Sequence, residues 1–311
     1  MPSHLRFQSQ KWATQHIVSR CLQGFAFLKP TKEIRTITKG VLGYALHKYE
    51  EVIQLHHYVF LSNHFHFILS AESSRDLADF MCFFKGNLAR ELARIHDWHG
   101  TLWQKRYSSE EILDEAGLKE VFKYLTQNSV KEGLVDHPKE WKGLHGYHQQ
   151  VMKKSMSGPW IDRTGYYWAK QRRQEVSLGD FTTEYQIKLT PPPLWSDLTK
   201  LEYQQLCRIL SAEAIQEALR KRKTNQAMGM KRVLRQNSYK PRFTKKGTRP
   251  LCRTKCIKTL KAYQKLYFEF KAKFQEVSAE LRQAIHLGRE TAFICFPEGG
   301  VPMFGGRYSP D

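Results

Sequence analysis

The stretch LSNHFHFILS (residues 61–70) places two histidines one residue apart in a run that otherwise has the composition of a buried strand. Successive strand residues point to opposite faces of a sheet, so His64 and His66 share one face while Phe65 and Phe67 share the other. The phenylalanines can then pack in the core, and the two imidazoles stand at a spacing that lets both bind one metal ion. Taken alone, the pair also fits two ordinary half-buried histidines.

The residues around this stretch predict a complete small fold. Residues 52–61 form a hairpin with 64–70, because Ser62 and Asn63 between them are typical turn residues. Apolar spacing then predicts further strands at 12–20 and 101–113, and helices at 31–49, 73–98 and about 116–128. The order strand, helix, strand, strand, helix, strand, helix predicts the α+β class, with a ferredoxin-like antiparallel sheet covered by helices.

The charge of the chain indicates a polyanionic partner. Its 311 residues include 50 Lys and Arg against 30 Asp and Glu, which gives a net charge of +20. Such a field attracts nucleic acid. A cationic protein on a membrane surface is the competing interpretation, but no apolar run is long enough to span a bilayer and no signal peptide is visible, so we expect a cytoplasmic protein. The six scattered cysteines then predict no disulfides, and Cys252 and Cys256 give only a weak zinc signal.

The second half of the chain differs in character. Residues 151–200 are broken by prolines and glycines and predict a linker or extension, whereas 201–311 predict a basic, mainly helical region that includes a long helix at about 259–285. Between 220 and 258 there are fifteen Lys and Arg and no acidic residue. The part near 236–256 is predicted to be flexible, although Tyr239 and Phe243 within it are also suited to stacking on bases.

The helix at about 116–128 supplies a possible partner for the histidines. At about 100° per residue, Tyr124 lies on the flank of the apolar stripe and Asn128, one turn later, lies close to it, whereas Gln127 points nearly opposite the stripe. Tyr124 and Asn128 can therefore face the same neighbouring surface. Each also has an ordinary interpretation, as a boundary aromatic and as a residue near a helix C-terminus.

Several blocks together resemble a known family. YVFLSNHFHFILS, GTLWQKRYSSEEI, VFKYLTQNSVKEGLV and HPKEW follow one another in the order and spacing of the REP-associated tyrosine transposases, which belong to the HUH superfamily of single-strand DNA nucleases. The resemblance covers roughly residues 12–150 and so assigns a catalytic domain to 1–150. Two departures concern the turns: Leu61 and Ser62 stand where the family usually has Met-Pro, and Ser129 stands where it usually has Pro.

The resemblance implies roles for individual residues. His64 and His66 would be metal ligands, Asn128 the third protein ligand and Tyr124 the nucleophile, with Mg²⁺ or Mn²⁺ as the cofactor. The substrate would be single-stranded DNA at hairpin-forming repeats, cleaved and rejoined through a 5′-phosphotyrosine link. Candidates for DNA contacts are basic residues and the family block around Trp103, namely Lys85, Arg90, Arg94, Trp103, Gln104, Lys105, Arg106 and Lys131.

Two other functions fit parts of the sequence. A catalytically silent or domesticated protein of the same fold would bind hairpins or single strands without cleaving them. An RNA-binding module on a ferredoxin-like sheet would explain the charge but not the paired histidines. Relatives suggest a monomer, and the sequence leaves a dimer open. If the C-terminal part reads the hairpin, deletion of residues 200–311 should weaken DNA binding more than it harms the fold of the first half.

Overall fold

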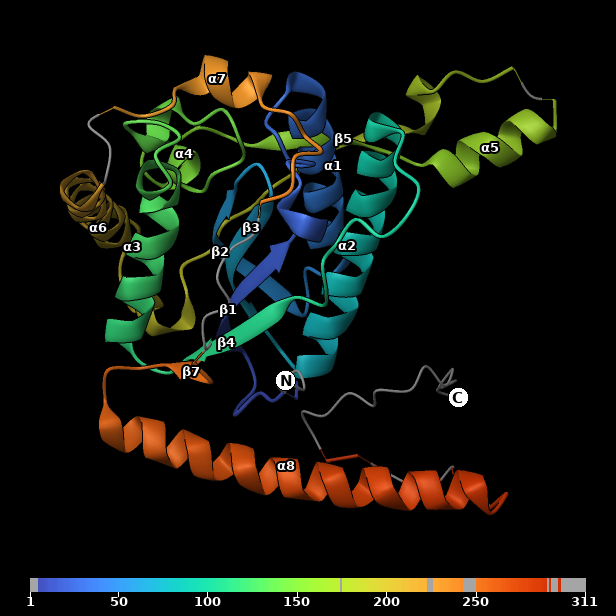
Figure 1. Ribbon diagram of the computed structural model, residues 1–311, viewed down its shortest axis with the longest axis vertical. Coiled ribbons are helices and arrows are strands. Elements are labelled where there is room, and N and C mark those ends of the chain that lie inside the picture. The colour runs from blue at the N-terminus through green and yellow to red at the C-terminus, as the bar shows by residue number, and fades with distance from the viewer. Residues whose placement is uncertain are drawn as a thin grey trace.

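The computed structural model describes residues 5–173, 175–222, 226–242, 250–289, 291 and 296–297. Its centre is a five-stranded sheet with helices on both faces (Figure 1). The strands lie in the order β2-β3-β1-β4-β7, and all neighbours are antiparallel except β4 and β7. The strands are β1 (Ala13–Arg20), β2 (Ile53–Phe60), β3 (His64–Ala71), β4 (Ser108–Ile112) and β7 (Cys252–Arg253).

Two helices cover one face of the sheet. The helices α1 (Lys32–Lys48) and α2 (Ser74–His96) begin at Thr31 and Ser73, whose side chains accept hydrogen bonds from the backbone of the first turn. Phe65 and Phe67 of β3 are fully buried against them, in the larger apolar cluster of the molecule. The odd-numbered residues of the opening stretch therefore form the core, as their alternation predicts.

The other face of the sheet carries α3 (Glu115–Lys131), on which α6 (Lys200–Lys221) packs in turn (Figure 1). Asp114 caps α3 by accepting a hydrogen bond of 2.7 Å from the Gly117 amide. Val59 and Ile68 of the sheet, Leu125 of α3 and Leu210 of α6 share a second apolar cluster. The helix that bears Tyr124 and Asn128 is thus held between the sheet and the C-terminal half of the chain.

The remaining elements lie in the second half of the chain or in connections. They are the 3-10 helices η1 (Leu22–Gly24), η2 (Pro138–Glu140), η3 (Gly179–Phe181) and η4 (Pro193–Trp195), the helices α4 (Tyr147–Gln150), α5 (Arg163–Gln171), α7 (Met230–Arg235) and α8 (Ile257–His286), and the antiparallel strands β5 (Ser157–Ile161) and β6 (Thr182–Gln186).

The basic C-terminal region returns to the first half at several points. Tyr239 stacks on Trp98 and donates a hydrogen bond of 2.7 Å to the His96 carbonyl. The helix α8 runs past the lower edge of the sheet (Figure 1), where Tyr263 donates to Glu111 over 3.3 Å. The division into 1–150, 151–200 and 201–311 stays a prediction. Of the segment predicted to be flexible near 236–256, residues 243–249, with Phe243, lie outside the described residues.

The α+β fold class and its ferredoxin-like strand order are confirmed by this arrangement. The strand predicted at 101–113 is wrong in extent, because β4 covers only Ser108–Ile112. Residues before it form a connection in which Trp103 makes an isolated bridge to Cys21. Among the helices that the structure describes, none has both the length and the apolar character needed to cross a bilayer.

Candidate active site

His64 and His66 lie on the face of β3 that points toward α3. Both are nearly inaccessible to solvent, with relative exposures of 6% and 4%. The even-numbered neighbour Ile68 packs in the α3 cluster, whereas Phe65 and Phe67 pack on the α1 and α2 side. The imidazole ring centroids are 5.0 Å apart. The histidines therefore share one buried surface, as period-two alternation requires.

The ring of His64 is oriented by the turn residue beside it. Asn63 Nδ2 donates to the Gly24 carbonyl over 3.2 Å, which turns its Oδ1 toward His64 Nδ1 at 2.6 Å. Because that oxygen only accepts, the proton of the neutral ring lies on Nδ1 and Nε2 keeps a lone pair. Burial, followed by the charge of Arg20, lowers the pKa of His64 to about 3, so the ring is neutral at pH 7.

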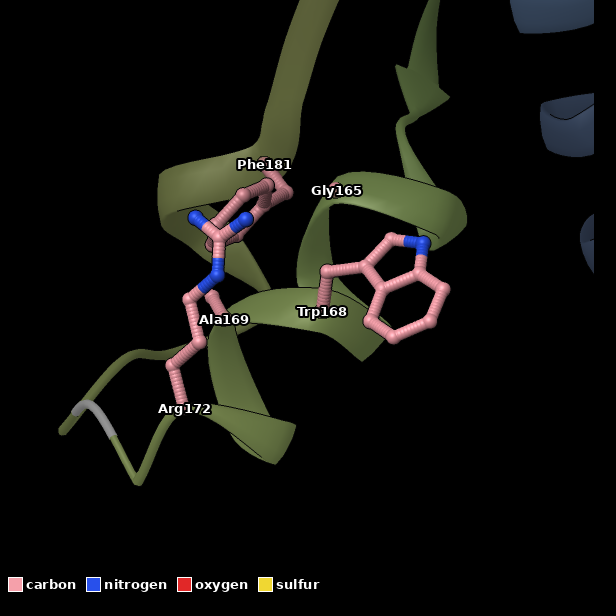
Figure 2. Close-up of a pocket in the computed structure, with 5 residues that line it drawn as sticks. All are labelled: Gly165, Trp168, Ala169, Arg172 and Phe181. Atoms are coloured by element: carbon pink, nitrogen blue, oxygen red, sulfur yellow. The ribbon is translucent and has the colours of Figure 1, made fainter.

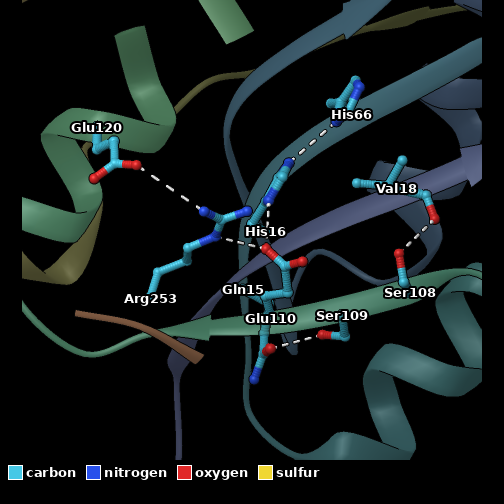
Figure 3. Close-up of polar contacts among 9 residues, drawn as sticks. All are labelled: Gln15, His16, Val18, His66, Ser108, Ser109, Glu110, Glu120 and Arg253. Atoms are coloured by element: carbon cyan, nitrogen blue, oxygen red, sulfur yellow. Dashed lines mark hydrogen bonds and ion pairs between the residues drawn. The ribbon is translucent and has the colours of Figure 1, made fainter. Parts of the chain in front are cut away.

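The ring of His66 is oriented by a chain of side chains that crosses the sheet (Figure 3). His16 on β1 lies 3.2 Å from Glu110 of β4 through Nδ1 and 3.1 Å from His66 Nδ1 through Nε2. A carboxylate only accepts, so His16 donates from Nδ1 to Glu110, and its Nε2 shares a hydrogen bond with His66 Nδ1. This bond orients the ring of His66 through Nδ1, so that Nε2 is the ring nitrogen not bonded to His16.

Arg253 of β7 holds the far end of this chain. Its Nε donates to Glu110 over 2.7 Å, and its Nη1 lies 4.0 Å from Glu120 of α3 (Figure 3). Burial alone would raise the pKa of Glu110, but the hydrogen bonds and charges of His16 and Arg253 outweigh it and lower the pKa. Glu110 is therefore ionised while buried. We call His66, His16, Glu110 and Arg253 the relay.

Tyr124 on α3 stands over the same surface. Its ring centroid is 5.4 Å from that of His66 and 6.1 Å from that of His16, with both contacts edge to face. Lys131, two turns later on α3, places Nζ 4.9 Å from the Tyr124 ring centroid. Burial and then the charge of Glu132 raise the pKa of Tyr124, so its phenol is neutral at pH 7. The unaided phenol is a weak nucleophile.

Asn128, one turn after Tyr124, is fully buried, whereas Gln127 is partly accessible. Within the described part of the chain, neither Oδ1 nor Nδ2 of Asn128 has a hydrogen-bond partner. A buried amide without partners is costly and therefore uncommon in folded proteins. Its oxygen is the kind of ligand that Mg²⁺ and Mn²⁺ accept, so the residues present fit a divalent ion. Among the described residues, no cluster of three or more His, Cys, Asp or Glu is arranged to hold a metal.

Comparison with known proteins places this surface in a family. Residues 13–128, which include both histidines, Tyr124 and Asn128, match the family model described as "Transposase IS200 like". This segment is an IS200-like transposase domain. The match ends at Asn128, so the rest of the chain, including Arg253 of the relay, lies outside it.

Solved structures that resemble the transposase domain are distant. One is described as a REP-associated tyrosine transposase bound to a REP hairpin; it is 18% identical, covers 49% of this chain and 87% of its own, and has a TM-score of 0.37. Another, from Deinococcus radiodurans R1 and described as a proposed transposase, is 18% identical, covers 38% of this chain and 92% of its own, and has a TM-score of 0.29. No curated protein matches the chain.

Two of the residues predicted to contact DNA serve the interior of the transposase domain. Lys85 is only 9% exposed; its Nζ donates to the Lys105 carbonyl over 3.1 Å and lies 5.3 Å from the Trp103 ring centroid. Trp103 in turn donates from Nε1 to the Lys85 carbonyl over 3.0 Å. The pair closes the connection between α2 and β4. Lys85 is therefore a structural residue here, and burial lowers its pKa to about 8.

The other candidates lie at the surface of the transposase domain. Arg94 is exposed and bonded to Glu91 of the same helix over 3.2 Å. The remaining side chains are exposed: Arg90, Gln104, Lys105, Arg106 and Lys131. Lys131 contacts the candidate active site through the ring of Tyr124.

Sequence reasoning missed His16, Glu110 and Arg253. His16 and Glu110 carried a partial signal, because each is a titratable residue inside a segment predicted to be a buried strand. Their partnership depends on β1 and β4 being neighbours with His16 directly opposite Glu110. Arg253 carried no signal, since it lies 143 residues from Glu110 in a two-residue strand.

Proposed function

We propose that the chain is a metal-dependent single-stranded DNA endonuclease and strand transferase that cleaves at hairpins with Tyr124 as the nucleophile. Membership of its domain in the IS200-like transposases makes it a DNA-processing protein. The observation that carries the finer proposal is the edge-to-face contact of Tyr124 with His66, together with the buried, unpartnered amide of Asn128 one helical turn after Tyr124. A solved REP-associated relative was bound to a REP hairpin, which suggests the substrate class.

The metal would be Mg²⁺ or Mn²⁺, held by Nε2 of His64, Nε2 of His66 and Oδ1 of Asn128. When bound, it would polarise the scissile phosphodiester and offset the negative charge that develops on it. Asn63 holds the proton of His64 on Nδ1, and His16 orients His66 through its Nδ1, so Nε2 is the nitrogen of each ring that would bind the ion. Because burial keeps His64 neutral, its Nε2 need not lose a proton first.

Tyr124 would attack the phosphorus through its phenolic oxygen. The phenolic proton leaves to solvent, the bond between phosphorus and the 3′-oxygen breaks, and that oxygen takes up a proton to become a 3′-hydroxyl. The product is a 5′-phosphotyrosyl link, and attack on it by another 3′-hydroxyl joins two DNA ends without an energy cofactor. Tyr124 and His66 meet within one chain, which favours a monomer that acts in cis.

The experiment is incubation of the protein with single-stranded hairpin DNA and Mn²⁺, followed by a denaturing gel. The account predicts a protein–DNA adduct that survives denaturation, disappears in EDTA and is lost in Tyr124→Phe. A protein that binds the hairpin without forming any adduct would contradict it and would identify the chain as a silent hairpin-binding protein.

A further inference from the structure

A projecting arm, formed by β5, α5, η3 and β6 (described residues 157–173 and 175–186), lies outside the transposase domain (Figure 1). Its two strands lie directly on α1: a Cβ added to Gly40 would be 1.8 Å from the Pro159 carbonyl oxygen, and one added to Gly43 would be 2.8 Å from that of Tyr185. Only glycine permits this approach. Trp160 also stacks on Tyr44 with ring centroids 4.5 Å apart.

A buried ion pair fixes the start of α5 against α2. Arg163 donates to both oxygens of Glu91, over 2.7 and 2.8 Å, and Glu91 is only 8% exposed. Arg94 of α2 shares the same carboxylate. The arm is therefore anchored at its strands and at its helix, so its outer surface has a defined position next to the exposed cations of α2.

That outer surface has a cavity of about 570 Å³ (Figure 2). Trp168 stands on one side, Arg172 and Phe181 stand on the other, and Gly165 and the buried Ala169 form the base. Trp168 is 55% exposed and the adjacent Tyr167 is 54% exposed, so two large aromatic side chains of one helix face solvent. Large aromatic side chains exposed beside a concavity are typical of a binding site.

The charge around the cavity identifies the ligand class. Arg172 is the one charged residue among the described residues that line the cavity, and Lys170 and Arg173 are close to it in the chain. The nearby carboxylates of Asp162 and Asp180 accept hydrogen bonds from the backbone amides of Gly165 and Ser177. Cations that neutralise phosphates, combined with an aromatic ring that offers its face, are the features by which proteins bind single strands. A duplex cannot use such a cavity in the same way, because its base faces are already stacked.

We propose that this cavity binds an unpaired nucleotide of single-stranded DNA that flanks the processed site, with the base stacked on Trp168 and the phosphate at Arg172. The inference rests on the proposed function, because it supplies a flank-binding site for the same substrate. The arm would hold the strand away from the hairpin, beside Arg94 of α2, which shares the Glu91 carboxylate with Arg163 of the arm.

The test measures DNA affinity in EDTA, where no cleavage occurs, with the full chain and two probes: a fluorescent hairpin with a single-stranded tail and the same hairpin without it. Trp168→Ala should weaken binding of the tailed probe about tenfold and leave the blunt probe unchanged. Trp168→Phe should retain most of the affinity. For the tailed probe, Arg172→Ala should lower the affinity and should reduce the steepness of the plot of log association constant against log salt concentration by about one.

Matched controls are Leu201→Ala and Arg208→Ala on α6, both at exposed positions outside the arm. They should bind both probes like the wild type. A tail that carries a photoreactive 5-iodouracil should crosslink to a peptide within 163–181. The proposal would be overturned if the wild type and Trp168→Ala bound the tailed probe with equal affinity, or if the tail crosslinked only to peptides outside 163–181. It would also be overturned if the chain self-associated and Trp168→Ala abolished that self-association. If the arm does not bind the tail, Tyr124 should still form its adduct with DNA. The two proposals can therefore be refuted independently.

Discussion

At the scale of single residues, the side-chain amide of Asn128 is unfavourable for stability and is also a proposed metal ligand. Its amide is fully buried and has no hydrogen-bond partner among the described residues, although its backbone belongs to a well-packed helix. An unsatisfied buried amide costs roughly 1–3 kcal/mol. A metal ligand explains why such a group stands next to Tyr124, because the ion would satisfy the amide oxygen.

We expect Asn128→Leu to raise the free energy of unfolding of the metal-free protein by roughly 1–3 kcal/mol, since leucine has a similar volume and no polar atom to bury. The same variant should lose Mn²⁺ binding and adduct formation. Urea unfolding in EDTA and a Mn²⁺ titration measure the two effects. A variant that is less stable and still active would show that the amide serves the fold and not an ion.

The relay predicts a second residue-level effect. Glu110→Gln keeps the size of the side chain but removes the charge that holds the proton of His16 on Nδ1, so His66 is no longer fixed as a ligand. Loss of such an outer contact typically weakens metal binding 10- to 100-fold. Titration with Mn²⁺, read from the electron paramagnetic resonance of the free ion, measures this directly.

The control for that change is Glu115→Gln, which removes an exposed carboxylate at the start of α3 that pairs with Lys119. It should bind Mn²⁺ like the wild type. Unchanged Mn²⁺ affinity in Glu110→Gln would mean that the relay has no influence on the site.

At the scale of elements, alanine substitutions at two helix glycines distinguish the effect of close packing on stability from the effect of helix propensity. Gly40 of α1 touches β5, so Gly40→Ala should cost several kcal/mol or displace the arm. Gly86 of α2 has only the end of Arg90 within reach, at 3.9 Å, so Gly86→Ala should add about 0.5–1 kcal/mol through better helix propensity. Thermal unfolding of both variants checks the pair, and a change of the same sign in both would refute the assigned contact.

Buried histidines between β2, α3 and the segment after η2 predict acid sensitivity. Burial lowers the pKa of His56 to about 4 and of His57 to about 3, and lowers that of His145 well below its usual value. These rings are neutral when folded and bind protons below about pH 6.5 when unfolded. Their stabilisation is therefore complete above pH 6.5 and falls as pH drops toward 4, by up to about 1.4 kcal/mol per pH unit for each ring.

Urea unfolding in EDTA at pH 7 and pH 5 measures that loss. His56→Gln removes one of the titrating rings and should make the difference between the two pH values smaller, whatever its effect at pH 7. Replacement of His99, which is exposed, should leave the difference as in the wild type. A stability that does not change between pH 7 and pH 5 would contradict the assigned protonation states.

How much the sequence predicts depends on whether a feature is local. Alternation within one strand predicted His64 and His66 on one face, and both are buried. Helical spacing favoured Asn128 over Gln127 as the partner of Tyr124; Asn128 is buried and Gln127 is partly accessible, and the role of Asn128 stays a prediction. The relay depends on which strands are neighbours and in what register, so His16 and Glu110 could not be paired beforehand. The burial of Lys85 could not be predicted, because a lysine that donates to a carbonyl of a distant segment has no sequence pattern.

At the scale of the whole molecule, the C-terminal half supports the nucleophile helix. Cys207 and Leu210 of α6 share an apolar cluster with Leu125 of α3, and Arg253 completes the relay. We therefore expect a chain that ends at residue 199 to lose cooperative unfolding or drop in melting temperature by more than 10 °C. From the sequence, the expectation was that deletion of residues 200–311 weakens DNA binding more than it harms the fold of the first half, if the C-terminal part reads the hairpin. Circular dichroism of the shortened chain distinguishes them, and an unchanged transition would favour separate domains.

The central claim is that Tyr124 forms a covalent link to the 5′ side of a cleaved strand. The most direct measurement labels the hairpin DNA at either end, incubates it with the protein and Mn²⁺, and maps the labelled protein by protease digestion and mass spectrometry. The account predicts that only the 3′-end label stays with the protein and that the modified peptide contains Tyr124. A label retained from the 5′ end, or a nucleotide attached to any other residue, would contradict the claim.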